Sequence, residues 1–423
     1  MSTFDRIRPT LERILERYAD LWSEIKPVVI VNRDLFGRVG FIVHEHWQDD
    51  KRLKVFAREV KKQLGPHAFD EEEAFLWEEN VDPDTERGPK VELRPGVWLV
   101  DRLAVESDWT WVLEAQADSD SRRPRIAFYS LKGGVGRSTA LAVAAWAFAG
   151  EGKRVLVVDL DLEAPGLSAL LLPENRLPAY GVVDWLVEDL VDNGDVIVPD
   201  MVASSPLGDP LEGDILVVPA HGRDAGAYVL KLGRVWMPKR GHDDSLETWP
   251  VRLARLMYTL ETETEPDIVL LDVRAGLDET ASAALMALAP DLTLLFAVEG
   301  DQTWAGYRLL FRHWRTYRVT EGVWERLRVV AALVPPGEGA AAYLDGVRQE
   351  AWVLFEEEVY GEVGEVFDER DEEAPHFPWP VYWHRSLVGA SNVYTLDARV
   401  LQEFSESEFV PCLRQHLGGF DGE

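Results

Sequence analysis

The strongest constraint on this fold comes from the segment 126–139, which reads Ile-Ala-Phe-Tyr-Ser-Leu-Lys-Gly-Gly-Val-Gly-Arg-Ser-Thr. An apolar run leads into a glycine-rich turn, and a basic residue with two hydroxyls opens a second apolar run. This order predicts a buried strand, a tight turn and a helix. Backbone N–H groups of such a turn point inward, and the helix adds the positive end of its dipole. The segment therefore predicts a phosphate cradle.

Each residue type in the predicted cradle has a physical reason. Glycines let the backbone curl, and a Ser or Thr hydroxyl at the start of the helix suits Mg²⁺. The candidate phosphate-binding residues are Lys132, Gly133, Gly134, Val135, Gly136, Arg137, Ser138 and Thr139. The competing interpretation is a glycine-rich turn that binds nothing.

Two further apolar runs end in acidic residues. Residues 154–166 predict a strand buried on both faces, with Asp159 and Asp161 on one side of its end. Residues 266–276 repeat the pattern with Asp272. Carboxylates at the ends of parallel strands suit metal binding and the positioning of water. Alternatively, one acid of the first pair merely caps the following helix.

These three motifs resemble those of the ParA/MinD family of ATPases. The run Lys-Gly-Gly-Val-Gly-x-Ser-Thr resembles the family's deviant Walker A motif, Asp159-Leu-Asp161 its second motif, and the strand ending in Asp272 its Walker B motif. A weaker likeness, over residues 377–390, concerns a late strand and loop near the base pocket. The resemblance extends from residue 125 to about residue 400.

The resemblance implies roles for individual residues. Lys132 would reach across a nucleotide-sandwich dimer to the partner's phosphates, and Asp161 would orient or activate the attacking water. The expected magnesium ligands are Ser138, Asp159 and Asp272, and the backbone N–H at Gly276 would face the γ-phosphate. Arg137 stands where the family has a second lysine. Arginine keeps its charge and binds phosphate bidentately but is wider than lysine, so the rate of hydrolysis is open.

Two features around this site leave alternatives. Arg274 binds phosphate, contacts a partner subunit or, as we favour, forms a plain ion pair with an acid such as Asp161 or Glu163. The family's adenine-reading Asn is replaced by the sequence Leu-Val-Pro-Pro at 333–336. ATP is still the expected nucleotide, and Tyr382 or Trp383 either stacks on its base or packs in the core.

Alternating elements predict an α/β fold with a doubly wound, mostly parallel sheet in residues 123–423. The expected strands are 125–130, 155–159, 215–219, 268–272, 292–298 and 329–333. Residues 1–122 predict a small α+β module of unknown role. Its expected elements are a helix over 4–25, strands at 28–31 and 39–43, a helix near 50–64 and strands within 91–105. Residues 116–124 are the linker candidate.

Composition restricts the partners. The net charge of −31 argues against nucleic acid, which needs a basic surface, and the acidic C-terminal segment argues against a basic membrane-binding helix. No run approaches ~20 apolar residues and no signal peptide is recognised, so we expect a cytoplasmic protein. The single cysteine excludes a disulfide framework. His44 and His46, on one expected strand face, lack a third metal ligand.

These observations favour an ATP-binding switch that dimerises around Mg-ATP, hydrolyses it slowly and controls an unknown protein partner. One alternative is a scaffold that binds nucleotide without turnover, as a regulatory subunit of a larger complex such as a bacterial conflict system. Another is a kinase-like or amidoligase-like enzyme, for which no second substrate motif appears.

Overall fold

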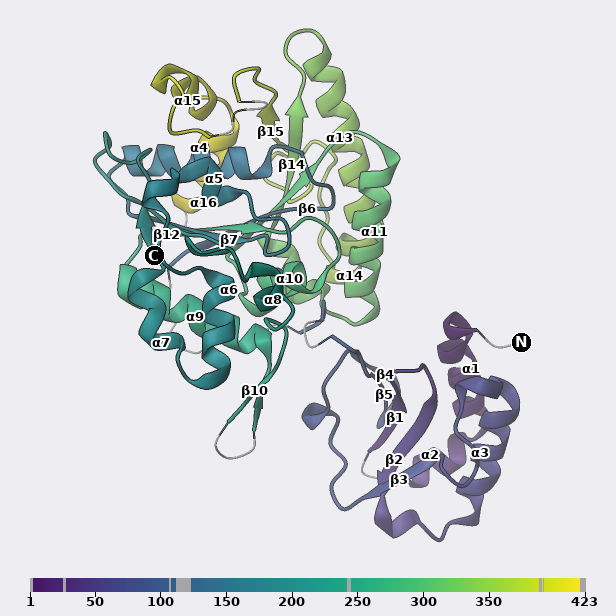
Figure 1. Cartoon of the computed structure of the whole chain (residues 1–423). Helices are drawn as coiled ribbons and strands as arrows, with labels where there is room; N and C mark the ends of the chain where they lie inside the picture. Colours follow the sequence, from purple (N-terminus) through teal and green to yellow (C-terminus); the bar gives the residue numbers. More distant parts are fainter. Residues whose placement is uncertain are drawn as a thin grey trace. The chain divides into compact units, whose positions relative to one another are not determined.

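A computed structural model describes residues 3–25, 28–105, 108–111, 123–241, 245–387, 390 and 392–418 (Figure 1). The chain forms two compact units, one of residues up to Trp111 together with Thr316–Arg318, and one of the remaining residues. The linker candidate, 116–124, lies almost entirely outside the described residues. The boundary at 122/123 therefore stays a prediction.

The first unit is a five-stranded sheet packed with helices. The sheet has the order β3-β2-β1-β5-β4, in which β1 is parallel to β5 and antiparallel to β2. Its elements are α1 (Phe4–Arg17), α2 (Ala19–Glu24), β1 (Val29–Arg33), β2 (Val39–His44), α3 (Lys51–Leu64), β3 (Phe75–Glu78), β4 (Lys90–Arg94) and β5 (Val97–Asp101).

Two expectations for this unit are wrong, and one strand was missed. The helix over 4–25 breaks at Tyr18, whose backbone leaves the helical region at φ −104 and ψ 27, and Trp22 in α2 packs on Phe56. Strand β3 was not expected. His46 lies in a 3₁₀ turn after β2, so it shares no strand face with His44. Among the described residues, no group of three or more His, Cys, Asp or Glu is arranged to hold a metal ion.

The second unit contains an eight-stranded sheet of order β15-β14-β13-β6-β12-β7-β9-β8, parallel except for β8. Its strands are β6 (Arg125–Ser130), β7 (Val155–Leu160), β8 (Ala203–Ser204), β9 (Ile215–Val218), β12 (Ile268–Val273), β13 (Leu292–Ala297), β14 (Leu327–Val334) and β15 (Trp379–Tyr382). The small hairpin of β10 (Lys239–Arg240) and β11 (Leu246–Glu247) forms a separate sheet. The expected doubly wound α/β fold is confirmed.

Helices cover both faces of this sheet, with α4 and α9 on opposite sides (Figure 1). They are α4 (Arg137–Gly150), α5 (Leu167–Leu171), α6 (Val182–Glu188), α7 (Gly194–Ile197), α8 (Tyr228–Leu232), α9 (Trp249–Thr264), α10 (Glu279–Ser282), α11 (Asp301–Thr316), α12 (Thr320–Val323), α13 (Gly339–Phe355), α14 (Gly361–Val363), α15 (Ala398–Ser405) and α16 (Phe409–Gly418). No helix in the described ranges is long and apolar enough to span a bilayer.

Helix α4 is apolar around its whole circumference, as a helix inside a core has to be. Its alanines and Phe148 pack between the sheet and α15, in a cluster that includes Phe128 of β6 and Phe409 of α16. Strands β6, β7 and β12 are buried along their full lengths. This packing fixes the start of α4 against the end of β6, where the glycine turn lies.

One buried and one partly buried histidine of this unit predict a loss of stability in acid. Burial lowers the pKa of His376, and it lowers the pKa of His416 to about 4. The unfolded chain takes up protons at both imidazoles near the ordinary histidine value of about 6.5, and the folded chain does not. The stabilising contribution is therefore present above that pH and is lost as the pH falls below it.

We expect the substitution His416→Asn to recover about 1 kcal/mol of the stability that the wild type loses between about pH 7 and about pH 5. Denaturant unfolding at a series of pH values measures this. His384→Asn is the control, because that imidazole lies partly exposed near Glu403. Parallel curves for His416→Asn and the wild type would contradict the expectation.

Candidate phosphate-binding site

The candidate site lies where three neighbouring strands end. Strand β12 pairs in parallel with β6 on one side and with β7 on the other, so their carboxyl ends meet at one edge of the sheet. The register places Asp272 of β12 directly beside Asp159 of β7. A doubly wound sheet binds ligands at this kind of edge.

The glycine turn between β6 and α4 presents unbonded backbone donors. Gly134 and Gly136 have φ values of 75° and 80°, which other residues rarely adopt. Within the described part of the chain, the backbone N–H groups from Gly133 to Thr139 have no hydrogen-bond partner. Free donors at a helix N-terminus are what an anion such as phosphate requires.

Arg137 points into the acidic edge of the site. It is 8% exposed, and its guanidinium donates to Asp272 Oδ1 at 2.9 Å and to Ser130 Oγ at 3.0 Å. A longer contact of 3.5 Å joins it to Asp161. The sequence resemblance implied phosphate contacts for this residue, whereas in this structure its donors are directed at acids and a hydroxyl.

The predicted magnesium ligands gather around the same guanidinium. Ser138 donates its hydroxyl to Asp272 Oδ2 at 2.7 Å, whereas no such bond from the Thr139 hydroxyl is seen among the described residues. Asp159 is fully buried, and its Oδ2 atom has no hydrogen-bond partner among the described residues. Its Oδ1 atom accepts the N–H of Asp161 at 3.0 Å.

Burial dominates the electrostatics of Asp159 and Asp161 at the end of β7. It raises the pKa of Asp159 well above the ordinary range, and the neighbouring Asp272 adds to the effect. Burial also raises the pKa of Asp161, which the positive charge of Arg137 partly offsets. Both carboxylates therefore favour a cation nearby.

Lys132 differs from Arg137 in having no partner. Its carbonyl accepts the Ser130 hydroxyl at 2.8 Å, but its ammonium makes no hydrogen bond or ion pair with any described residue. The side chain is partly exposed at the start of the glycine turn. The charge is therefore available to a ligand or to another chain.

In the loop after β12, the Gly276 N–H does not have the orientation that we expected. Its N–H donates to the Ser130 carbonyl at 3.0 Å, so in this structure it does not face the phosphate position. The Gly276 carbonyl in turn accepts the Tyr129 hydroxyl at 2.9 Å. Arg274 forms ion pairs with Glu163 and Asp278, in line with the structural alternative that we favoured for it.

The end of β14 packs against the glycine turn. A Cβ atom built on Gly136 would lie 3.4 Å from the Leu333 side chain, and Leu333 itself has a positive φ of 56°. The N–H of Trp383 donates to the Val334 carbonyl at 2.8 Å. Trp383 is 39% exposed, whereas the Tyr382 hydroxyl is bonded to Glu408. Of the two aromatic candidates, Trp383 is the one with a free face.

Sequence reasoning missed the parts played by Tyr129 and Ser130. Their hydroxyls tie the end of β6 to the loop after β12 and to Arg137. The available signal was a pair of polar groups at the end of an otherwise apolar strand.

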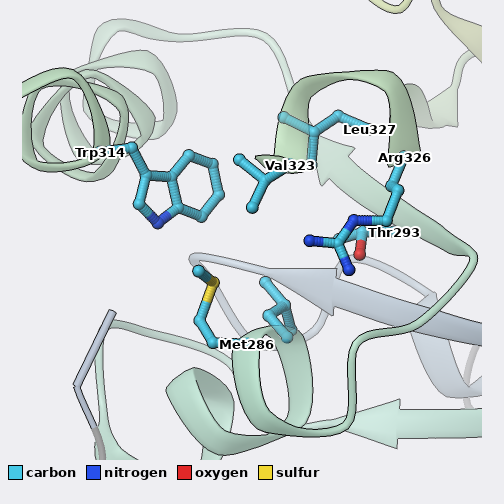
Figure 2. Close-up of a pocket in the computed structure, with 7 residues that line it drawn as sticks. Met286, Thr293, Trp314, Val323, Arg326 and Leu327 are labelled. Carbon is cyan, nitrogen blue, oxygen red and sulfur yellow. The ribbon is translucent and has the colours of Figure 1, made fainter. Parts of the chain in front are cut away.

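A small cavity elsewhere in the unit carries no chemistry. Figure 2 shows Met286, Thr293, Trp314 and Arg326 around it, and its volume is about 10 Å³, roughly enough for one water molecule. Thr293 and Leu327 lie at the amino ends of β13 and β14, so the cavity is at the opposite edge of the sheet from the glycine turn.

Comparisons with known proteins agree with the motifs. Residues 124–200 match the AAA domain family AAA_31. A stretch of 52 residues is 48% identical to the chloroplastic Fe-S cluster assembly factor HCF101 of Oryza sativa subsp. japonica, covering 12% of this chain and 10% of that protein. The chain thus spans about a tenth of that relative's length. The AAA domain match, which includes the glycine turn, Asp159 and Asp161, supports a P-loop ATPase relationship.

Two solved structures are also similar to this chain. The structure of pNOB8 ParA has 16% identity and a TM-score of 0.44, covering 70% of this chain and 100% of that one. The ParA family ATPase from Chlorobium tepidum TLS has 15% identity and a TM-score of 0.41, covering 68% and 95%. The fold assignment rests on the strand order of this chain.

We expect Gly134→Ala to weaken nucleotide binding by roughly tenfold, because alanine at a positive φ costs about 1–2 kcal/mol. A Cβ at this position meets no neighbouring atom, so the effect isolates backbone strain. Calorimetric titration with Mg-ATP measures the affinity. Gly133→Ala is the matched control, since that position also has open space but no positive φ. Equal affinities for the two variants would argue against a cradle that depends on the left-handed backbone at Gly134.

Proposed function

We propose that this protein is an ATP-dependent switch of the ParA/MinD type, which dimerises around the nucleotide, hydrolyses it slowly and changes its protein partner between nucleotide states. The observation that carries the proposal is the row of free N–H groups from Gly133 to Thr139 beside a cluster of acids. The AAA domain match over the same segment supports it. We also propose that the segment Lys132–Thr139 acts as a deviant Walker A motif.

The residues present fit a magnesium ion. Ser138, Asp159 and Asp272 offer hard oxygen atoms, and the buried Oδ2 atom of Asp159 lacks a partner among the described residues. Magnesium usually combines one or two carboxylates with phosphate oxygens, which agrees with the lack of an all-protein cage in the described ranges. When bound, the ion would neutralise charge that develops on the phosphates.

The remaining roles belong to side chains of this chain. Asp161, partly buried at the end of β7, would hold the attacking water, and Arg137 would bind phosphate oxygens once it leaves the acids. The uncommitted Lys132 ammonium is free to reach the phosphates bound by a second copy. The net charge of −31 favours a protein partner over nucleic acid.

We expect Lys132→Ala to abolish ATP-dependent dimerisation while leaving the fold intact, because this ammonium makes no hydrogen bond or ion pair with any described residue of its own chain. Light scattering with Mg-ATP, with Mg-ADP and without nucleotide measures the mass. Asp161→Ala should prolong the ATP-bound dimer, since hydrolysis resets it. Lys153→Ala is a matched control, because Lys153 precedes β7 at the opposite edge of the sheet. A Lys132→Ala variant that still dimerises with ATP would rule out the trans-acting role.

A second candidate function is a nucleotide-binding scaffold without turnover. This candidate is supported by the ion pairs of Arg137 with Asp272 and Asp161. These pairs occupy the two carboxylates that hydrolysis would require. Tight binding of ATP with no Asp161-dependent phosphate release would favour the scaffold. A mass that does not respond to nucleotide would favour it further.

We also propose that Trp383 stacks on the nucleotide base. Its backbone N–H donates to Val334 at the end of β14, next to Leu333, whose side chain lies against Gly136. We expect Trp383→Ala to weaken ATP binding about tenfold, since stacking on an aromatic side chain contributes about 1–3 kcal/mol per base. Titration with ATP and with inorganic triphosphate separates base from phosphate contacts, because the triphosphate affinity should not change. Trp324→Ala is the control, because Trp324 lies just before the amino end of β14, at the opposite end of the strand from Val334. Equal loss for both ligands would refute stacking.

A further inference from the structure

Three carboxylates of the second unit lie close together and largely away from water. Asp159 and Asp272 are 0% and 2% exposed and face each other on adjacent strands, and Asp161 follows on the same side of β7. Burying several charges of one sign is costly unless a cation compensates them. A positive charge at this edge therefore stabilises the ionised forms of these acids.

Arg137 supplies that charge. Among the described residues it is the cation that forms ion pairs with both Asp161 and Asp272, while Lys132 pairs with neither and Arg274 pairs with Glu163 and Asp278. The planar guanidinium has five donors, and three of its nitrogens serve Asp272, Ser130 and Asp161. A lysine ammonium is a point charge that cannot present this fork.

Both oxygens of Asp272 are occupied in this arrangement. Oδ1 accepts from Arg137 and Oδ2 accepts from the Ser138 hydroxyl. A hydrated metal ion that engages Asp272 therefore competes with these two bonds and with the positive charge of the guanidinium. The Asp159 Oδ2 atom, which lacks a partner among the described residues, is fully buried behind the same pair.

We propose that the Arg137 guanidinium is a built-in counter-ion that replaces magnesium in the nucleotide-free protein and releases Asp272 only when phosphate offers it another acceptor. The proposal rests on the proposed nucleotide site and deepens it, because it makes nucleotide the ligand that opens the metal site. Phosphate and the metal then promote each other's binding, as linkage between two sites requires.

The test is the effect of Mg²⁺ alone on the thermal unfolding of the nucleotide-free full chain. We expect the wild-type melting temperature to be the same in EDTA and in saturating Mg²⁺ at matched ionic strength. Arg137→Met leaves the three acids without their counter-ion, so it should melt lower in EDTA and gain about 5 °C with Mg²⁺. Equal responses of the two proteins to Mg²⁺ would overturn the proposal.

A matched control removes a different buried arginine. Arg125 is 6% exposed and pairs with Glu261 at the amino end of β6, away from the acid cluster. Arg125→Met should melt lower than the wild type without responding to Mg²⁺. If it responds as Arg137→Met does, the effect is general and the proposal fails.

Two further measurements keep the result decisive. If Arg137→Met does not fold, Arg137→Lys replaces it. Its melting temperature should respond to Mg²⁺ more than that of the wild type, because an ammonium lacks the forked donors of a guanidinium.

Titration of the wild type with Mg²⁺, with and without ADP, should show binding only with ADP. If ADP does not bind but Arg137→Met still responds to Mg²⁺, the counter-ion role stands and the proposed function falls. If ADP binds and the responses are equal, the counter-ion role alone falls.

Discussion

The insertion of β12 between β6 and β7 is the constraint on which the candidate site depends. Strand β7 follows β6 in the chain but is separated from it in the sheet by a strand that comes more than a hundred residues later. This order brings the glycine turn and the acids of two motifs to one edge. It also forces Asp159 and Asp272 into register, so their charges have to be compensated locally.

Groups that attract an anion and groups that attract a cation therefore lie together at this edge of the sheet. The turn from Gly133 to Thr139 offers unbonded N–H donors and a helix N-terminus, both of which attract an anion. A few residues away, the acids attract a cation. A magnesium–phosphate pair satisfies both demands at once, whereas either ion alone satisfies one and leaves the other. These two demands support the proposal of a metal-bound nucleotide as the ligand.

The sequence predicted six strands of the second unit closely because their residues form continuous apolar runs, whereas β8 was not among the expected strands. Strand β6 has the expected bounds, and β7 and β12 extend one residue further. Local pattern did not reveal β3, four residues whose alternation is weak, or the break at Tyr18, which depends on how Trp22 packs against Phe56. These features arise from tertiary contacts between segments far apart in the chain.

In the candidate site, too, some features could be predicted from the sequence and others depend on tertiary contacts. The motif resemblance implied that Ser138, Asp159 and Asp272 lie near one another, and strand ends and helix starts have few degrees of freedom. It could not assign the partners of Arg137, because a long side chain chooses among acceptors that the fold brings together from three motifs. Nor could it show that the Gly276 N–H donates to Ser130. An arginine in place of lysine therefore changes more than the contact with phosphate. It couples the acids to the cradle through one side chain, and whether that coupling is released during a nucleotide cycle separates a switch from a scaffold.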